Sequence, residues 1–311
     1  MTSKLLLCSN LVLLSIFMFC CSSPQVATPV FDGDLAYQHL IHQVEFTPRV
    51  PGSEASARCR NYVYDFFDSL GLSVDSQMFT FLDPYSGQDI PMVNVIAHCN
   101  PQLDASQRIV LMAHYDSRPR TDYAFDTLLI DEPIDGANDG ASGVAVLLEL
   151  ARLLSIQPPS VGVDLVLVDG EDWGKSGDSQ YYLLGSREFA RRGIRDRYQF
   201  GIVIDMIGDR DQQVYREAFS ERYNKPLNDL VWETAQRLGV TTFIDSVHYT
   251  VMDDHLPLQA SGVPSIVLID FDYPEWHTEF DTPDKCSAQS LSNVGRILVD
   301  IVYKPENWPR K

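Results

Sequence analysis

The stretch VDLVLVDGEDWG, residues 163–174, joins a largely apolar run to three acidic residues that follow within four positions. The run at 163–168 is typical of a buried β-strand, which is rich in branched apolar side chains. The acids Asp169, Glu171 and Asp172 should then crowd together where the strand ends. Adjacent carboxylates at a buried strand end raise each other's pKa unless a cation is close. The stretch therefore predicts a metal ion.

Similar apolar runs alternate with helical patterns along the chain. The runs predict strands at 72–82, 92–99, 108–116, 161–169, 200–208 and 264–270. Apolar residues spaced by three and four positions predict helices at 34–46, 53–70, 141–155, 186–193, 226–239 and 287–303. Strands that alternate with helices in this way predict an α/β fold. We expect a three-layer sandwich with a mixed, largely parallel central sheet that helices cover on both faces.

Composition restricts the class of protein. The chain has 311 residues, of which 45% are hydrophobic and 22% charged, as is usual for a globular enzyme. Its formal net charge of −19 argues against a nucleic-acid partner, because phosphate binding needs basic patches. The sequence shows no internal repeat, so residues 32–311 are predicted to form a single catalytic domain, with a monomer as the default state.

The amino terminus predicts export. Lys4 precedes a long apolar stretch that ends in paired cysteines, as in a bacterial-type secretory signal over residues 1–21. The cysteine pair suggests lipoprotein processing with lipid on Cys21 or Cys20, followed by a short tether over 22–31. We therefore expect an exported, periplasmic bacterial protein that is anchored to a membrane; the alternatives are simple cleavage of the signal or its retention as an anchor.

Two features of the body stay open. Cys59, Cys99 and Cys286 form no CxxC pair, which disfavours a cysteine zinc site but permits one disulfide of undefined pairing. The segment 119–134 is long, acidic and aromatic, and it could be a lid over a site or a surface connection.

Polar side chains collect at the predicted strand ends. His114, the pair Glu171–Asp172, Asp205 and His277 follow different strands, and Asp139 precedes a helix within GANDGASG. In an open α/β sheet, ligands bind beyond the carboxyl ends of the strands. Taken singly, Asp139 could be a turn residue, His114 a core histidine and Asp205 a partner for Arg210. Convergence of five segments on one edge favours a common site.

The residue types narrow the metal. Two carboxylates and one imidazole, without a thiolate, are typical of a catalytic zinc site that leaves one position open. Asp139, Asp172 and His277 fit that set, which leaves Glu171 as general base. His114 and Asp205 could complete a second metal site or orient the ligands of the first.

An ordered set of motifs resembles the glutaminyl cyclases and, more broadly, the zinc aminopeptidase superfamily. The set spans nearly all of residues 31–303 and comprises PGS (51–53), AHYDSR (113–118), GANDGASGV (136–144), DGEDWG (169–174), GSREF (185–189), IDMIGD (204–209), DDHLP (253–257) and PEWHTEFDTPD (274–284).

The resemblance implies a role for each matching residue. Asp139, Asp172 and His277 would hold one zinc ion, with His114 as an orienting residue or second-metal ligand. Glu171 would be the proton shuttle, and Asp205 with Asp253 an acidic hydrogen-bonded pair. The substrate pocket would be shaped by Trp276, Trp173 and by Phe271 or Tyr273. One departure concerns position 172, where the animal cyclases carry glutamate; the shorter Asp172 would sit closer to the metal or bind through one oxygen.

The implied function is a cyclotransferase that converts the N-terminal glutamine of peptides or proteins to pyroglutamate and releases ammonia. The alternative is a di-zinc aminopeptidase with two zinc ions, because all five ligand positions of such a site are filled. Resemblance in DDHLP and YPEWH favours the cyclase. A non-catalytic binding protein would be expected to lose Glu171, Asp139 or His277, and all three are present.

Overall fold

The structure, a computed structural model, describes residues 28–309. The predicted signal, Cys20, Cys21 and most of the predicted tether lie outside these residues. Phe31, the last residue of that tether, is buried against Gly295. None of the helices within the described part is long and apolar enough to cross a membrane.

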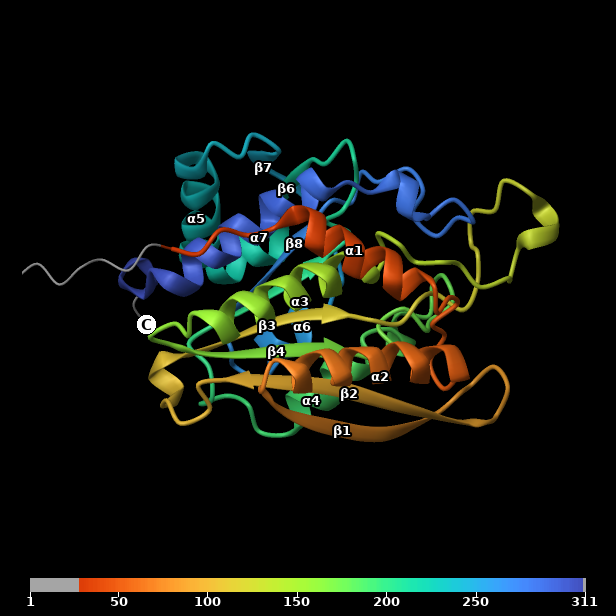
Figure 1. The fold of residues 1–311 in the computed structure, drawn as a ribbon. Coiled ribbons are helices and arrows are strands. Elements are labelled where there is room, and N and C mark those ends of the chain that lie inside the picture. Colours follow the sequence, from red (N-terminus) through yellow and green to blue (C-terminus); the bar gives the residue numbers. More distant parts are fainter. Residues whose placement is uncertain (1–27, 310–311) are drawn as a thin grey trace, which may run out of the picture.

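The described chain forms helices and strands in alternation (Figure 1). The helices are α1 (Gly33–Val44), α2 (Glu54–Ser69), α3 (Ala141–Ile156), α4 (Leu184–Arg191), α5 (Ala218–Leu238), α6 (His255–Ala260) and α7 (Ala288–Tyr303). The strands are β1 (Ser73–Leu82), β2 (Asp89–Cys99), β3 (Arg108–His114), β4 (Gly162–Val168), β5 (Gly201–Asp205), β6 (Val214–Glu217), β7 (Phe243–Tyr249) and β8 (Ser265–Ile269).

The central sheet has six strands in the order β1-β2-β4-β3-β5-β8. Strands β4, β3, β5 and β8 are mutually parallel, whereas β2 runs antiparallel to both β1 and β4. The sheet is therefore mixed and largely parallel, which confirms the predicted fold class.

Helices cover both faces of the sheet because successive side chains of a strand point to opposite faces, and those of the buried strands are nearly all apolar. Leu111 and Leu165 face one core, together with residues of α1, α3 and α7. Met112 and Val166 face the other core, together with Phe189 of α4 and residues of α6. Figure 1 shows α1, α3 and α7 in front of the sheet. This packing fixes the strand ends that carry the site.

Three short elements were not predicted. Strands β6 and β7 form a separate two-stranded sheet, and α6 has only six residues. Helix α5 begins at Ala218 instead of 226, and Asn224 has non-helical dihedral angles beside Pro226, so the predicted start coincides with a kink. The cysteines Cys59, Cys99 and Cys286 are each buried and free, so none of them forms a disulfide.

Candidate active site

The carboxyl ends of β3, β4, β5 and β8 lie along one edge of the sheet. His114 is the last residue of β3, and Asp205 is the last residue of β5. Glu171 and Asp172 follow β4 directly, and His277 follows β8. The parallel register thus brings together side chains that are up to 163 positions apart in the sequence (277 − 114).

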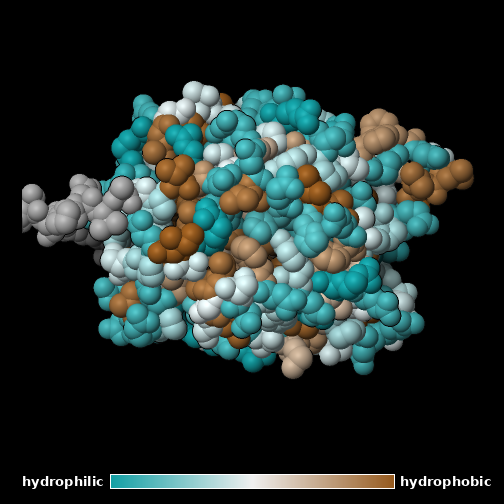
Figure 2. All heavy atoms as spheres, viewed as in Figure 1, coloured by the Kyte–Doolittle hydropathy of each residue, from teal (hydrophilic) through white to brown (hydrophobic). Residues whose placement is uncertain are grey.

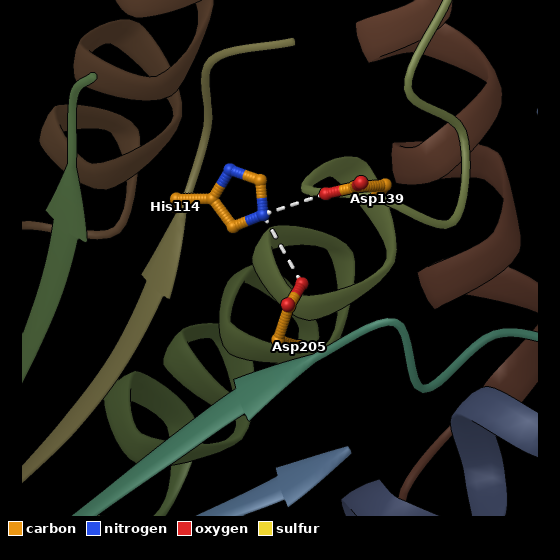
Figure 3. A group of neighbouring side chains, drawn as sticks. All are labelled: His114, Asp139 and Asp205. Atoms are coloured by element: carbon orange, nitrogen blue, oxygen red, sulfur yellow. Dashed lines mark hydrogen bonds and ion pairs between the residues drawn. The ribbon is translucent and has the colours of Figure 1, made fainter. Parts of the chain in front are cut away.

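Asp139, in the loop before α3, joins this group and faces His114 with one oxygen (Figure 3). His114 Nε2 lies 3.1 Å from Asp139 Oδ1 and 3.1 Å from Asp205 Oδ1. The other oxygen of Asp139, Oδ2, lies 3.7 Å from His277 Nε2, which is 3.4 Å from Asp172 Oδ2. Asp139 is therefore shared between two sets of side chains.

Each of these two sets could hold a metal ion. Within the described residues the sets are His114–Asp139–Asp205 and Asp139–Asp172–His277, and the ligand atoms of each lie within 4.8 Å of one another. The oxygen Oδ2 of Asp172 is buried without a hydrogen-bond partner, as expected for a metal-ligating atom. The second set offers two carboxylates and one imidazole, the donors of catalytic zinc sites, so these residues fit zinc.

Arg118 determines how Asp172 can bind. The buried guanidinium donates from Nη1 to Asp172 Oδ1 at 2.5 Å and to the Asp172 carbonyl at 3.1 Å. Burial alone would raise the pKa of Asp172, but His277 and Arg118 lower it to about 2. Because Oδ1 is engaged, Asp172 presents Oδ2 alone to a metal ion.

Asp122 orients His277. The imidazole Nδ1 lies 2.8 Å from Asp122 Oδ2, which leaves Nε2 to face the metal site. The backbone N–H groups of Asp122 and Tyr123 also donate to the His277 carbonyl. His277 itself has left-handed backbone geometry, with φ of 57°. Burial lowers the pKa of His277, but Asp172 and Asp122 raise it to about 9. The first residues of the 119–134 segment thus position a ligand.

Asp281 and a tight turn position Asp139. The carboxylate of Asp281 accepts from the N–H groups of Asn138 at 2.8 Å and Asp139 at 3.1 Å. Gly140 follows with φ of 101°, and a Cβ there would lie 2.7 Å from the Asp116 carbonyl oxygen. Only glycine adopts this turn without displacing its neighbours.

The three acids of DGEDWG, residues 169–174, make different contacts. Asp169 accepts from Val93 N at 3.0 Å and from the Tyr115 hydroxyl at 2.8 Å, so it ties the turn to neighbouring strands. Asp116 accepts from the N–H groups of Glu171 at 3.2 Å and Asp172 at 3.3 Å. These bonds hold the two site acids at the strand end.

A cavity of about 220 Å³ lies over these side chains. Its walls, among the described residues, are Asp139, Glu171, Asp172, Tyr182, Asp205, Met206, Thr250, Val251, Met252, Asp253, Ile269, Phe271, Trp276 and His277. Burial and the charge of Asp172 hold the pKa of Glu171 well above its usual range. Burial and the charge of Asp205 do the same for Asp253. The cavity therefore combines proton-holding acids with a metal site.

Two of the four predicted pocket residues line this cavity. Phe271 and Trp276 pack with ring centroids 5.0 Å apart and form its aromatic wall. Tyr273 and Trp173 are not among these described wall residues, and of the alternatives Phe271 and Tyr273 it is Phe271 that lines the cavity. Tyr273 donates to Asp281 Oδ1 at 2.8 Å, and Trp173 Nε1 donates to Asp83 Oδ1 at 3.0 Å, so each is taken up by packing.

Sequence reasoning missed the residues that hold the ligands. Arg118 and Asp281 lie within the quoted motifs AHYDSR and PEWHTEFDTPD, but they received no role. Asp122 lies in a segment for which the sequence offered no argument. The role of Arg118 follows from its burial among acids, which the structure shows and the sequence does not, because such a charge is almost never buried unpaired.

Comparison with known proteins assigns the chain to a family. The model of the family described as "Peptidase family M28" matches residues 94–302, about two thirds of the chain. The chain belongs to this family.

Solved and curated relatives include cyclases and a peptidase. The crystal structure of a Bacteroides thetaiotaomicron glutaminyl cyclase bound to N-acetylhistamine is 34% identical and covers 89% of this chain and 99% of its own, with a TM-score of 0.85. A Zn-dependent exopeptidase from Parabacteroides distasonis is 31% identical over 89% of this chain and 99% of its own, with a TM-score of 0.84. The glutaminyl-peptide cyclotransferase of Bothrops jararaca is 29% identical over 303 residues, 84% of this chain and 78% of the relative.

Proposed function

We propose that this protein is a zinc-dependent glutaminyl-peptide cyclotransferase that acts on peptides or proteins with an N-terminal glutamine. The observation that carries the proposal is the cavity of about 220 Å³, closed on one side by Trp276 and Phe271 and lined by Glu171. This volume is below the roughly 300–1,000 Å³ of common ligand pockets. It suits a single small side chain better than a peptidase groove, and the cyclase relatives agree with this assignment.

The reaction joins two parts of one residue. The substrate α-amine attacks the γ-carbonyl carbon, a C–N bond forms, and the bond to the amide nitrogen breaks to release ammonia. The attack is intramolecular, so much of the entropic barrier is already removed. Zinc held by Asp139, Asp172 and His277 would polarise the γ-carbonyl as a Lewis acid.

Glu171 moves the proton in this proposal. The ammonium of the substrate must lose protons before and during attack, and the leaving nitrogen must gain one. A carboxyl whose pKa is raised well above its usual range can accept a proton from the substrate ammonium and deliver it to the leaving amide nitrogen. Arg118 and Asp116 support the step by fixing Asp172 and the Glu171 backbone, respectively.

Asp205 and Asp253 hold the amine. Both line the cavity, and burial together with the charge of Asp205 raises the pKa of Asp253. A pair that shares one proton can accept a hydrogen bond from the substrate amine, and it repels the Glu171 carboxylate less than two charged carboxylates would. Loss of either carboxyl should therefore affect KM as well as kcat.

The second candidate is a di-zinc aminopeptidase, favoured by the complete second set His114–Asp139–Asp205 and by the exopeptidase relative. We assign one zinc ion per chain to the cyclase, and two would favour the peptidase. The test is to supply a Gln-initiated dipeptide amide and an aminoacyl chromogenic substrate in parallel. Ammonia with no free amino acid supports the cyclase, whereas free amino acid without cyclisation contradicts it.

We also infer export to the bacterial periplasm as a membrane-anchored lipoprotein, lipidated at Cys21 or Cys20, and action as a monomer. The signal-like residues 1–21 support export and lipidation, and the monomer is the default state in the absence of a repeat or partner signal in the sequence. Mass spectrometry of the mature amino terminus tests it, since an unmodified terminus with the signal retained would contradict lipidation.

A further inference from the structure

The segment between Thr121 and Ile134 projects from the body beside the site (Figure 1, yellow-green). Its neck is closed by a bridge between Thr121 and Ile130. Its tip is fixed because the N–H groups of Phe125 and Asp126 donate to the Glu279 carboxylate at 3.1 Å. The loop is thus an anchored surface and not a free lid.

Large apolar side chains are exposed on this loop and on the neighbouring turn. We call this surface the apolar tip, and its members are Tyr123 (55% exposed), Phe125 (75%), Leu128 (85%), Ile130 (50%) and Phe280 (44%). The rings of Phe125 and Phe280 pack edge-on with centroids 5.2 Å apart. Figure 2 shows brown side chains projecting at this edge of the molecule. Contiguous apolar surface of this kind marks an interaction site.

Tyr123 connects the apolar tip to the candidate active site. The ring of Tyr123 lies 5.7 Å from that of Trp276 and stacks toward His277 at 6.5 Å. Trp276 and His277 in turn line the cavity. Because the cavity of about 220 Å³ holds little beyond one residue, the rest of a bound peptide must leave it across the surrounding surface.

We propose that the apolar tip binds the two residues that follow the N-terminal glutamine, and so selects peptides with apolar side chains at their second and third positions. This inference rests on the proposed cyclotransferase function. Acidic residues on the same loop, Asp126, Asp131 and Glu132, would repel acidic peptides. Selection should therefore favour apolar and uncharged or basic sequences.

Charge argues against the two other occupants of this surface. A second copy would bring its own acidic loop, from a chain with net charge −19, against these carboxylates. An anionic lipid surface would meet the same repulsion. In addition, residue 28, where the described chain begins, lies at the opposite end of the molecule from the loop (Figure 1).

The experiment compares specificity ratios in zinc-loaded protein. The ratio is kcat/KM for Gln-Leu-Phe-amide over kcat/KM for Gln-Gly-Gly-amide, measured by ammonia release. The variant is Phe125→Ser combined with Leu128→Ser. The matched control is Met78→Ser combined with Leu82→Ser, which removes two apolar side chains that are 74% and 64% exposed on β1. A second variant, Phe280→Ser, tests the tip from the neighbouring turn.

We expect the wild-type ratio to exceed ten, and to fall about tenfold in the loop variant and severalfold in Phe280→Ser, while the control keeps the wild-type ratio. A wild-type ratio near one, with both peptides cyclised, overturns the inference and leaves the proposed function standing. If neither peptide is cyclised, both the inference and the proposed function are overturned. If the loop variant keeps the ratio but loses binding to phosphatidylcholine–phosphatidylglycerol vesicles, the tip is a membrane contact and the inference is wrong.

Discussion

Asp122 offers a direct test of how the zinc ligands are held, because it touches His277 without reaching the metal site itself. Its Oδ2 lies 2.8 Å from His277 Nδ1 and 2.7 Å from Arg118 Nε. The change Asp122→Asn keeps the shape and one acceptor oxygen but removes the charge. A charge-assisted hydrogen bond is about twice as strong as a neutral one. The substitution should therefore orient His277 less firmly and weaken the free energy of zinc binding by about 1–2 kcal/mol.

This cost predicts zinc affinity about tenfold weaker, since about 1.4 kcal/mol is a factor of ten. That value lies at the lower end of the 10–100-fold losses typical for partners of metal-ligating histidines. The assay is competition for zinc against a chelator of known affinity, at one pH and ionic strength. The matched control is Asp131→Asn, which makes the same charge change on the same loop, at a residue that already has positive φ. Wild-type affinity in Asp122→Asn, or equal loss in both variants, would refute the reasoning.

Two further predictions use other parts of the fold. Gly140→Ala should displace Asp139 and lower activity at least 100-fold, because φ is 101° and a Cβ would lie 2.7 Å from the Asp116 carbonyl oxygen, whereas Gly177→Ala, with φ of 91° and no atom within 4 Å of its Cβ, should keep its activity. Equal activity in the two variants would contradict the assigned turn. Burial raises the pKa of Asp164, but His98 and Tyr198 lower it below its usual range, with Arg108 adding to the effect. Asp164 therefore adds to the free energy of unfolding at pH values above about 3.9, its pKa in the unfolded chain. This contribution is lost as pH falls through the lower pKa of Asp164 in the folded protein. Denaturation midpoints of the wild type should drop more steeply below about pH 4 than those of Asp164→Asn, and identical slopes would contradict this.

The sequence predicted the layers and the strand ends well, since buried parallel strands are continuous apolar runs and their carboxyl ends must meet. VDLVLVDGEDWG illustrates the limit of that reasoning. Its pattern placed Glu171 and Asp172 at a strand end, but periodicity carries no information on which oxygen faces a metal ion. That detail depends on Arg118, which is 54 positions away and donates to Asp172 Oδ1.

Side-chain direction explains why Tyr273 and Trp173 do not line the cavity. Tyr273 and Trp173 are adjacent in sequence to site residues, but each has a polar atom that packing satisfies elsewhere, through Asp281 and Asp83. Adjacency to a ligand does not decide which way a ring points in an irregular loop. The strands β6 and β7 escaped prediction for another reason, because VYRE and FIDSVHY lack the continuous apolar runs of the central strands.

The central claim is that Glu171 moves a proton during cyclisation at a zinc site held by other residues. The most direct measurement is ammonia release from a Gln-initiated dipeptide amide by the wild type and by Glu171→Gln, with zinc content measured in the same samples. We predict one ammonia per pyroglutamyl peptide for the wild type, and for Glu171→Gln a loss of roughly 10²–10⁴-fold, the usual contribution of general acid–base catalysis, with zinc content unchanged. Full activity in Glu171→Gln at unchanged zinc content would contradict the account.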